Sequence, residues 1–114
     1  MKKYIVKGEA DLRFECLGDE RIKVLVMDDA DVRICVVVSS PCDVFLEVVM
    51  VGCGRVKPNM EVSCVEASVE HSLRTVVVSG DELVYLAMRG ICEDEARELV
   101  MDKVLAEFEG AEII

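Results

Sequence analysis

Residues 1–78 of the chain form a succession of short runs rich in Val and Ile, and this pattern limits the folds that the chain can adopt. Turn-forming residues such as Gly8, Gly18, Pro41 and Gly52 separate the runs. Strands spaced roughly 8–12 residues apart are typical of an all-β sandwich, a barrel or a solenoid. The seven predicted strands are Tyr4–Val6, Leu12–Cys16, Ile22–Met27, Val32–Val38, Val44–Val51, Met60–Val65 and Arg74–Val78.

The composition is that of one folded, acidic domain. The chain has 114 residues, of which 53% are hydrophobic, so it can bury a real core. A net charge of −10 argues against binding to nucleic acids or to anionic membrane surfaces, because both need clustered Lys and Arg. No uncharged apolar segment reaches the ~18 residues of a membrane span, and Met1–Lys7 lacks the apolar core of a signal peptide. We therefore expect a cytoplasmic protein.

Six cysteines occupy positions 16, 35, 42, 53, 64 and 92, without a C-x-x-C pair. In a chain without a signal peptide they are expected to be reduced, and most should be small buried apolar residues. Cys42, Cys53 and Cys64 follow one another at equal intervals. This spacing either arises by chance or indicates the repeating half-coil of a stacked β-solenoid.

From residue 79 onward the signals are helical. Ser79 and Glu82 have the spacing of a capping box, and the helix that they begin should end at Gly90. A second helix should begin at Cys92 as N-cap and end at Gly110. Its apolar positions form one wide stripe, which either belongs entirely to the core or packs on the strands with one flank and meets a partner with the other: Ala96, Leu99, Val100, Val104 and Phe108.

The sequence offers little support for catalysis. His71 is the single histidine, and the sequence shows neither a clear Ser-His-Asp set nor a His cluster, so a catalytic triad or a conventional zinc enzyme has little support. The chain also lacks a P-loop motif. We therefore predict a protein that is not an enzyme.

Residues 67–97 resemble the C-terminal signature of the SufB/SufD proteins of iron–sulfur cluster assembly. The segment reads "VEHSLRTVVVSGDELVYLAMRGICEDEAR" from Val69 to Arg97, and Tyr-Leu-x-x-Arg-Gly is its most specific part. Upstream, "PNMEV" at Pro58–Val62 resembles the family's "PYIEV", and "PCDVF" around Cys42 is a looser match. The positions that match the signature are His71, Leu83, Tyr85, Leu86, Arg89, Gly90, Glu95 and Ala96.

The resemblance implies a fold and a role. The fold is a short right-handed parallel β-helix over residues 1–78, followed by two C-terminal α-helices over residues 79–114, together one SufB/SufD-like domain. The role is that of a non-enzymatic scaffold that binds a SufC-like ATPase through the C-terminal helices. The implied partner-binding residues are Leu83, Tyr85, Leu86, Arg89 and Gly90. Arg89 could also pair with Glu93 or Asp94 of the second helix.

The ligand positions of the family are altered in this chain. Ser72 follows the histidine where SufB-type sequences carry Glu, and Val69 precedes it where SufD-type sequences often carry Cys. An alternative function is a small metal- or cluster-binding thiol protein that uses Cys42 and His71, with Cys64 as a third candidate, because iron accepts thiolate and imidazole ligands. The other alternative is a decayed family member in which only the interaction role remains.

The ends of a short solenoid predict self-assembly. Exposed strand edges pair readily, and terminal coils need caps. The apolar runs Val36–Val38 and Val48–Val51 also suggest coverage by another surface. We therefore expect a homodimer, or a heterodimer with a larger SufB/SufD-type protein, formed through strand pairing or packing.

Overall fold

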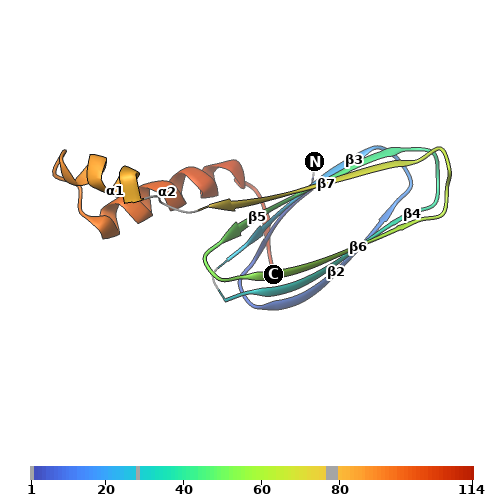
Figure 1. Cartoon of the computed structure of the whole chain (residues 1–114). Coiled ribbons are helices and arrows are strands. Elements are labelled where there is room, and N and C mark those ends of the chain that lie inside the picture. Colours follow the sequence, from blue (N-terminus) through green and yellow to red (C-terminus); the bar gives the residue numbers. More distant parts are fainter. Residues whose placement is uncertain (1, 28, 77–79) are drawn as a thin grey trace. The chain divides into compact units, whose positions relative to one another are not determined.

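A computed structural model of the chain describes residues 2–27, 29–76 and 80–114. It consists of two compact units. The first is formed by residues 1–76 and 110–114, and the second by residues 77–109. The first unit is a parallel β-solenoid of about three coils (Figure 1), and the second contains both helices, which confirms the predicted β-helix with two C-terminal helices.

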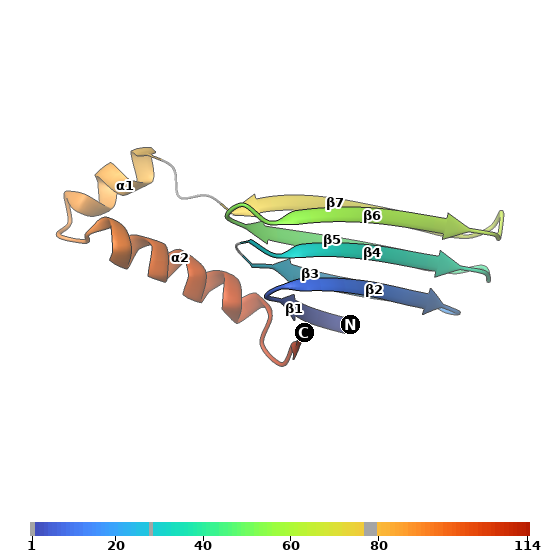
Figure 2. The same ribbon diagram turned by 90° about the horizontal axis from the view of Figure 1, so that it is seen from below.

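The strands of the solenoid alternate between two facing sheets. One sheet has the order β7-β5-β3-β1-β8 and the other the order β2-β4-β6, and every pairing is parallel. Figure 2 shows the strands stacked coil upon coil. Their bounds are β1 Lys2–Val6, β2 Glu9–Cys16, β3 Glu20–Val26, β4 Asp31–Val38, β5 Asp43–Val51, β6 Arg55–Val62, β7 Ser68–Val76 and β8 Glu112–Ile113.

The strand registers give the length of one coil. Lys2 lies beside Ile22, and Asp43 lies beside Ser68. Half of either interval is close to the equal spacing of the three cysteines 42, 53 and 64. Cys42 directly precedes β5, Cys53 lies between β5 and β6, and Cys64 follows β6. The three cysteines therefore lie at successive corners of the solenoid.

The core lies between the sheets and is densest in the middle coils. Valine supplies most of it, because its branched side chain fits the narrow space between two pleated sheets. The inward row Tyr4, Val24, Val48 and Leu73 shows the gradient along the stack. Val24 and Val48 are buried, Tyr4 is half-buried, and Leu73 is 62% exposed. The terminal coils thus leave their inner faces partly uncovered.

Coils contact each other closely at the corners. The backbone N–H of Asp43 donates to Asp19 Oδ1 at 2.7 Å, and the hydroxyl of Ser40 donates to the carbonyl of Leu17 at 2.8 Å. At Gly54 a Cβ would lie 2.8 Å from Cγ1 of Val26, so this corner requires a residue without a side chain.

The last two strands of the solenoid lie earlier than predicted. β6 begins at Arg55 and β7 at Ser68, whereas the apolar runs had placed them from Met60 and Arg74. Both belong to the terminal coil, where polar residues occupy much of each strand. The two-residue strand β8, which pairs with β1, was not predicted.

The second unit is a pair of helices, α1 Gly80–Ala87 and α2 Glu93–Glu107. Both lie within the predicted segments. Ser79, predicted as the N-cap of α1, is outside the described residues. Neither helix combines the length and apolar character that a membrane span needs, as far as the described residues extend.

Candidate functional site

The turn between α1 and α2 is built from the Tyr-Leu-x-x-Arg-Gly segment. Arg89 folds back over the ring of Tyr85, with its guanidinium carbon 4.9 Å from the ring centroid. These residues are four positions apart, so they share one face at the end of α1. The stack is a cation–π contact, which fixes the orientation of both side chains.

Gly90 ends α1 in the left-handed conformation, with φ of +81°. The N–H of Ile91 donates to the carbonyl of Leu86 at 2.9 Å, and the N–H of Gly90 donates to the carbonyl of Ala87 at 3.0 Å. This pair of hydrogen bonds is the Schellman motif. The Arg89-Gly90 dipeptide therefore has a structural role here: Gly90 reverses the chain, and Arg89 covers Tyr85.

The exposed surface of α1 is apolar. Val84, Tyr85 and Met88 are 61%, 55% and 83% exposed. Leu83 and Leu86, also predicted to bind a partner, are half-buried. We call Val84, Tyr85, Met88 and Arg89 the α1 patch. Of the five predicted partner-binding residues, Tyr85 and Arg89 thus lie in this exposed patch.

Among the described residues, the side-chain contact found for Arg89 is the ring of Tyr85, not Glu93 or Asp94, either of which the sequence allowed as an ion-pair partner. Glu93 instead accepts a hydrogen bond from Arg97, one helical turn further on, at 2.6 Å. Glu93 and Arg97 are four residues apart on α2, so the helix itself brings their side chains together. Arg89 precedes the chain reversal at Gly90, and its side chain stays stacked on Tyr85.

The apolar stripe of α2 has both buried and exposed members, so it is not entirely core. Ala96, Val104 and Phe108 are buried, whereas Leu99 is 53% exposed. Cys92 is the N-cap, with an extended backbone, and its side chain makes no capping hydrogen bond. The helix therefore begins without the polar cap that Ser at this position would supply.

Cys42 and His71 are not brought together within one chain. His71 lies beside Leu46 in the register of β5 and β7, and Cys42 precedes Leu46 by four residues. Four residues along a parallel strand correspond to about 13 Å. Cys64 lies at the corner before β7, outside the strand that carries His71. No group of three or more His, Cys, Asp or Glu in the described ranges is arranged to hold a metal ion.

His71 has a clear position in the fold. It ends an inward row in which Lys2 and His71 flank Ile22 and Leu46. The two apolar residues are fully buried, whereas both polar residues lie on the terminal strands, where the inner face meets solvent. A polar side chain at the solvent-exposed end of this row needs no ligand role to account for it. The hypothesis that His71 binds a metal stays a prediction, and such a site would need ligands from another chain.

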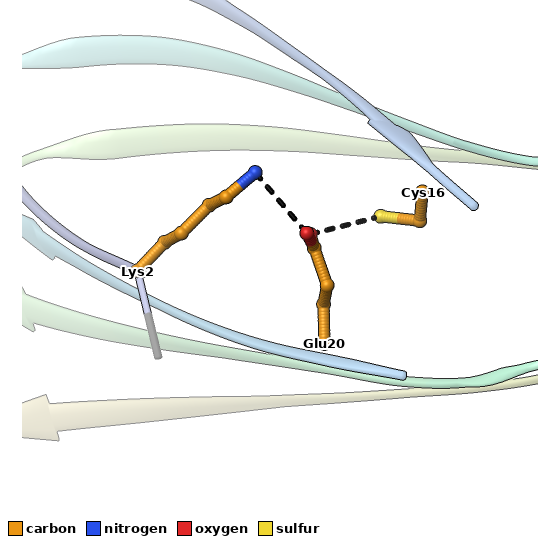
Figure 3. A network of polar contacts seen from close by, with 3 residues as sticks. All are labelled: Lys2, Cys16 and Glu20. Carbon is orange, nitrogen blue, oxygen red and sulfur yellow. Dashed lines mark hydrogen bonds and ion pairs between the residues drawn. The ribbon is translucent and has the colours of Figure 1, made fainter. Parts of the chain in front are cut away.

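A polar cluster that sequence reasoning did not identify lies at the corner between β2 and β3 (Figure 3). Lys2 Nζ is 3.2 Å from Glu20 Oε1, and Cys16 Sγ donates to Glu20 Oε2 at 3.5 Å. Burial, followed by the hydrogen bond to Glu20, raises the pKa of the Cys16 thiol to about 11. Cys16 thus stays protonated at neutral pH, and its thiol is a weak nucleophile there.

An open depression of about 810 Å³ adjoins this cluster. Its lining is mainly charged and comes from the corners of successive coils, including Lys2, Asp19, Glu20, Arg21, Asp43 and Glu70. Acidic and basic groups are mixed, and Asp19 already accepts the hydrogen bond from Asp43. Val44 and Phe45 are the apolar part of the lining, so the depression is mainly charged, whereas a typical small-molecule site is mainly apolar.

Comparisons with protein-family models, with curated proteins and with solved structures found no match to this chain. The surface with the strongest recognition chemistry is thus defined by its geometry alone. It is the α1 patch, in which an exposed aromatic ring, a methionine and an arginine share one helix end.

Proposed function

We propose that this chain is a non-enzymatic scaffold component of iron–sulfur cluster assembly in the cytoplasm. In this role it binds a SufC-like ATPase through the α1 patch. The proposal rests on the resemblance of residues 67–97 to the SufB/SufD signature, and on the presence of two of its residues, Tyr85 and Arg89, in an exposed patch.

The observation that carries the proposal is the chemistry of the patch. Interfaces are enriched in aromatic residues, Met and Arg, and depleted of Lys, Glu and Asp at their centres. The α1 patch presents Tyr85, Met88 and Arg89 in a chain with a net charge of −10. The stack of Arg89 on Tyr85 holds both side chains before a partner arrives, which reduces the entropy lost on binding.

The fold supports the same role. A β-solenoid is a rigid, extended body in which each coil contacts only its neighbours, and such bodies commonly serve as binding surfaces. The parallel solenoid with following helices is also the fold that the resemblance implies. A scaffold of this kind needs no catalytic residues of its own.

The test is the affinity of the purified chain for the SufC-type ATPase of the same organism, measured by isothermal titration calorimetry. Met88→Glu should abolish detectable binding, because it places a charge in the centre of the patch. Arg89→Glu should weaken binding at least about tenfold, since it removes a cation–π contact and reverses a charge.

The matched control is Arg13→Glu, which makes the same charge change at a 62%-exposed side chain on β2. It should bind like the wild-type chain. Truncation at Gly90 is avoided because it would also remove β8 from the solenoid. Absence of binding by a folded wild-type chain, or equal affinity for all four proteins, would refute the proposal.

A further inference from the structure

The open depression beside the Lys2–Glu20 pair has the size of a ligand site. Its volume of about 810 Å³ falls within the range of about 300–1,000 Å³ that small-molecule sites occupy. It lies where β3, β5 and β7 begin, and all of its lining residues belong to the first unit. The lining is mainly charged, so the charges that remain available decide which ligand the depression can hold.

Part of the charged lining is already satisfied by contacts within the solenoid. Lys2 and Glu20 form the ion pair shown in Figure 3, with 3.2 Å between Nζ and Oε1. Asp19 accepts the backbone N–H of Asp43 at 2.7 Å. These contacts tie neighbouring coils together at the rim, so they shape the depression without needing a ligand.

Arg21 and Glu70 are charged lining residues that remain available. Both are exposed, and among residues 2–27, 29–76 and 80–114 neither side chain lies within 4.0 Å of an oppositely charged group. Each therefore keeps its full capacity for charge-assisted hydrogen bonds, which are about twice as strong as neutral ones.

The strand register places these two charges on either side of an aromatic ring. Arg21 lies beside Phe45, and Phe45 lies beside Glu70, in one row across β3, β5 and β7. All three are on the outer face of the sheet, where Phe45 is half-buried. Because neighbouring strands are about 4.8 Å apart, the Cα atoms of Arg21 and Glu70 are about 10 Å apart.

The ligand that matches this row has a carboxylate at one end, an ammonium at the other and an apolar group between them. Arginine binds carboxylates bidentately, and a glutamate accepts hydrogen bonds from an ammonium. A purely anionic ligand would be repelled by Glu70 and by Asp43, which adjoins the row on β5. A purely cationic ligand would in turn be repelled by Arg21.

The spacing of the charges sets the length of the ligand. An extended chain spans about 3.3–3.6 Å per residue, so a tripeptide covers about 10 Å between its two charged ends. Its middle side chain would then lie over Phe45. Free peptides of this length carry both terminal charges at this separation, whereas an internal segment of a longer protein carries neither.

We propose that the depression is a binding site for a free, short, zwitterionic peptide. The peptide carboxylate pairs with Arg21, its ammonium pairs with Glu70, and an apolar side chain between them packs on Phe45. This inference does not rest on the proposed function, because the site lies in the first unit and the α1 patch lies in the second.

The test is a nuclear magnetic resonance titration of the isotope-labelled chain with the tripeptide alanyl-leucyl-alanine. It should bind with a dissociation constant of about 1 mM or below and shift the amide signals of Arg21, Phe45 and Glu70. Acetylation removes the ammonium of the peptide, and amidation removes its carboxylate. Each modified peptide should bind at least about threefold more weakly, the loss expected for one exposed ion pair.

Two charge-reversal variants assign the ends of the peptide. Arg21→Glu should bind the unmodified peptide about tenfold more weakly, because attraction becomes repulsion. It should bind the amidated peptide no more weakly than the wild-type chain does, since that peptide has no carboxylate to repel. Glu70→Arg should show the same pattern with the acetylated peptide. Arg33→Glu is the matched control, because it makes the same charge change at an exposed residue of the other sheet, and it should bind like the wild-type chain.

The modified peptides also separate a lost contact from a lost fold, since only a folded variant can bind the peptide that matches it. A wild-type chain whose signals do not shift with the unmodified peptide would overturn the inference. So would equal affinity for all three peptides, a loss on modification of one end only, or variants that bind every peptide as the wild-type chain does.

Discussion

Two inward-facing leucines on adjacent strands should differ in their contribution to stability. Leu46 of β5 is fully buried in the middle of the stack, whereas Leu73 of β7, one coil further, is 62% exposed. Replacing a fully buried leucine by alanine typically costs about 3 kcal/mol or more, because transfer energy is lost and a cavity remains. Leu46→Ala should therefore lower the free energy of unfolding by about 3 kcal/mol.

The same substitution at Leu73 should cost much less. Leu73 buries a little over a third of its surface, and scaling the first value by this fraction gives about 1 kcal/mol. The structure around it can also relax toward solvent, which reduces the cavity term. The expected difference between the variants is thus about 2 kcal/mol, or roughly a thirtyfold difference in the folding equilibrium.

Urea unfolding, followed by far-UV circular dichroism, measures both values. Because Leu73 adjoins the free edge of β7, the comparison is made at a concentration at which the wild-type chain sediments as a monomer. Losses of equal size in the two variants would refute the argument that the terminal coil is open. A loss below about 1 kcal/mol at Leu46 would contradict the assignment of this residue to the core.

Three further outcomes are expected. Cys92→Ser should raise the free energy of unfolding of the helical unit by about 0.5–1 kcal/mol and slow amide exchange at Asp94 and Glu95, since a hydroxyl caps the first turn; unchanged exchange would count against the cap. Gly90→Ala should lower that free energy by about 1 kcal/mol, because φ is +81°, and thermal unfolding measures the loss. Cys16 should make folding sensitive to alkali: its folded-state pKa of about 11 exceeds the ordinary value of 9.0, so its contribution is complete below pH 9 and is lost as the pH rises toward 11. The free energy of unfolding should therefore fall by up to about 2.7 kcal/mol across this range. Urea unfolding at about pH 8 and about pH 10.5 measures the fall, and the part due to Cys16 should be missing in Cys16→Val.

The middle of the solenoid could be predicted from the sequence because burial determines its composition. β3, β4 and β5 pack against strands on both sides, and their apolar runs fall within a residue or two of the observed bounds. β4 alternates between buried inner residues and partly exposed outer residues. Its sequence is nearly all apolar, so the outer face carries apolar residues that are not fully buried.

The terminal coil was harder to predict for the same physical reason. β6 and β7 have few buried residues, and Arg55 and Ser68 at their starts give no apolar signal. β8 has only two residues, and no local pattern identifies so short a strand. Pairing across the stack, rather than local sequence, defines these elements.

The site was predicted unevenly. The turn at Gly90 carries local signals, and the structure shows the hydrogen bonds that those signals imply. The cluster of Lys2, Cys16 and Glu20 depends on the register of the first coil, which spacing alone does not supply.

The pairing of β8 with β1 has a consequence for the order of folding during synthesis. Residues 112 and 113 complete an edge formed by the first strand, and the whole helical unit is translated between β7 and β8. The ribosome therefore releases three coils and two helices before the edge of β1 can be covered. Until then a newly made chain presents β1 as an open template, and a binding partner or chaperone that recognises unpaired strands would have its best opportunity in that interval.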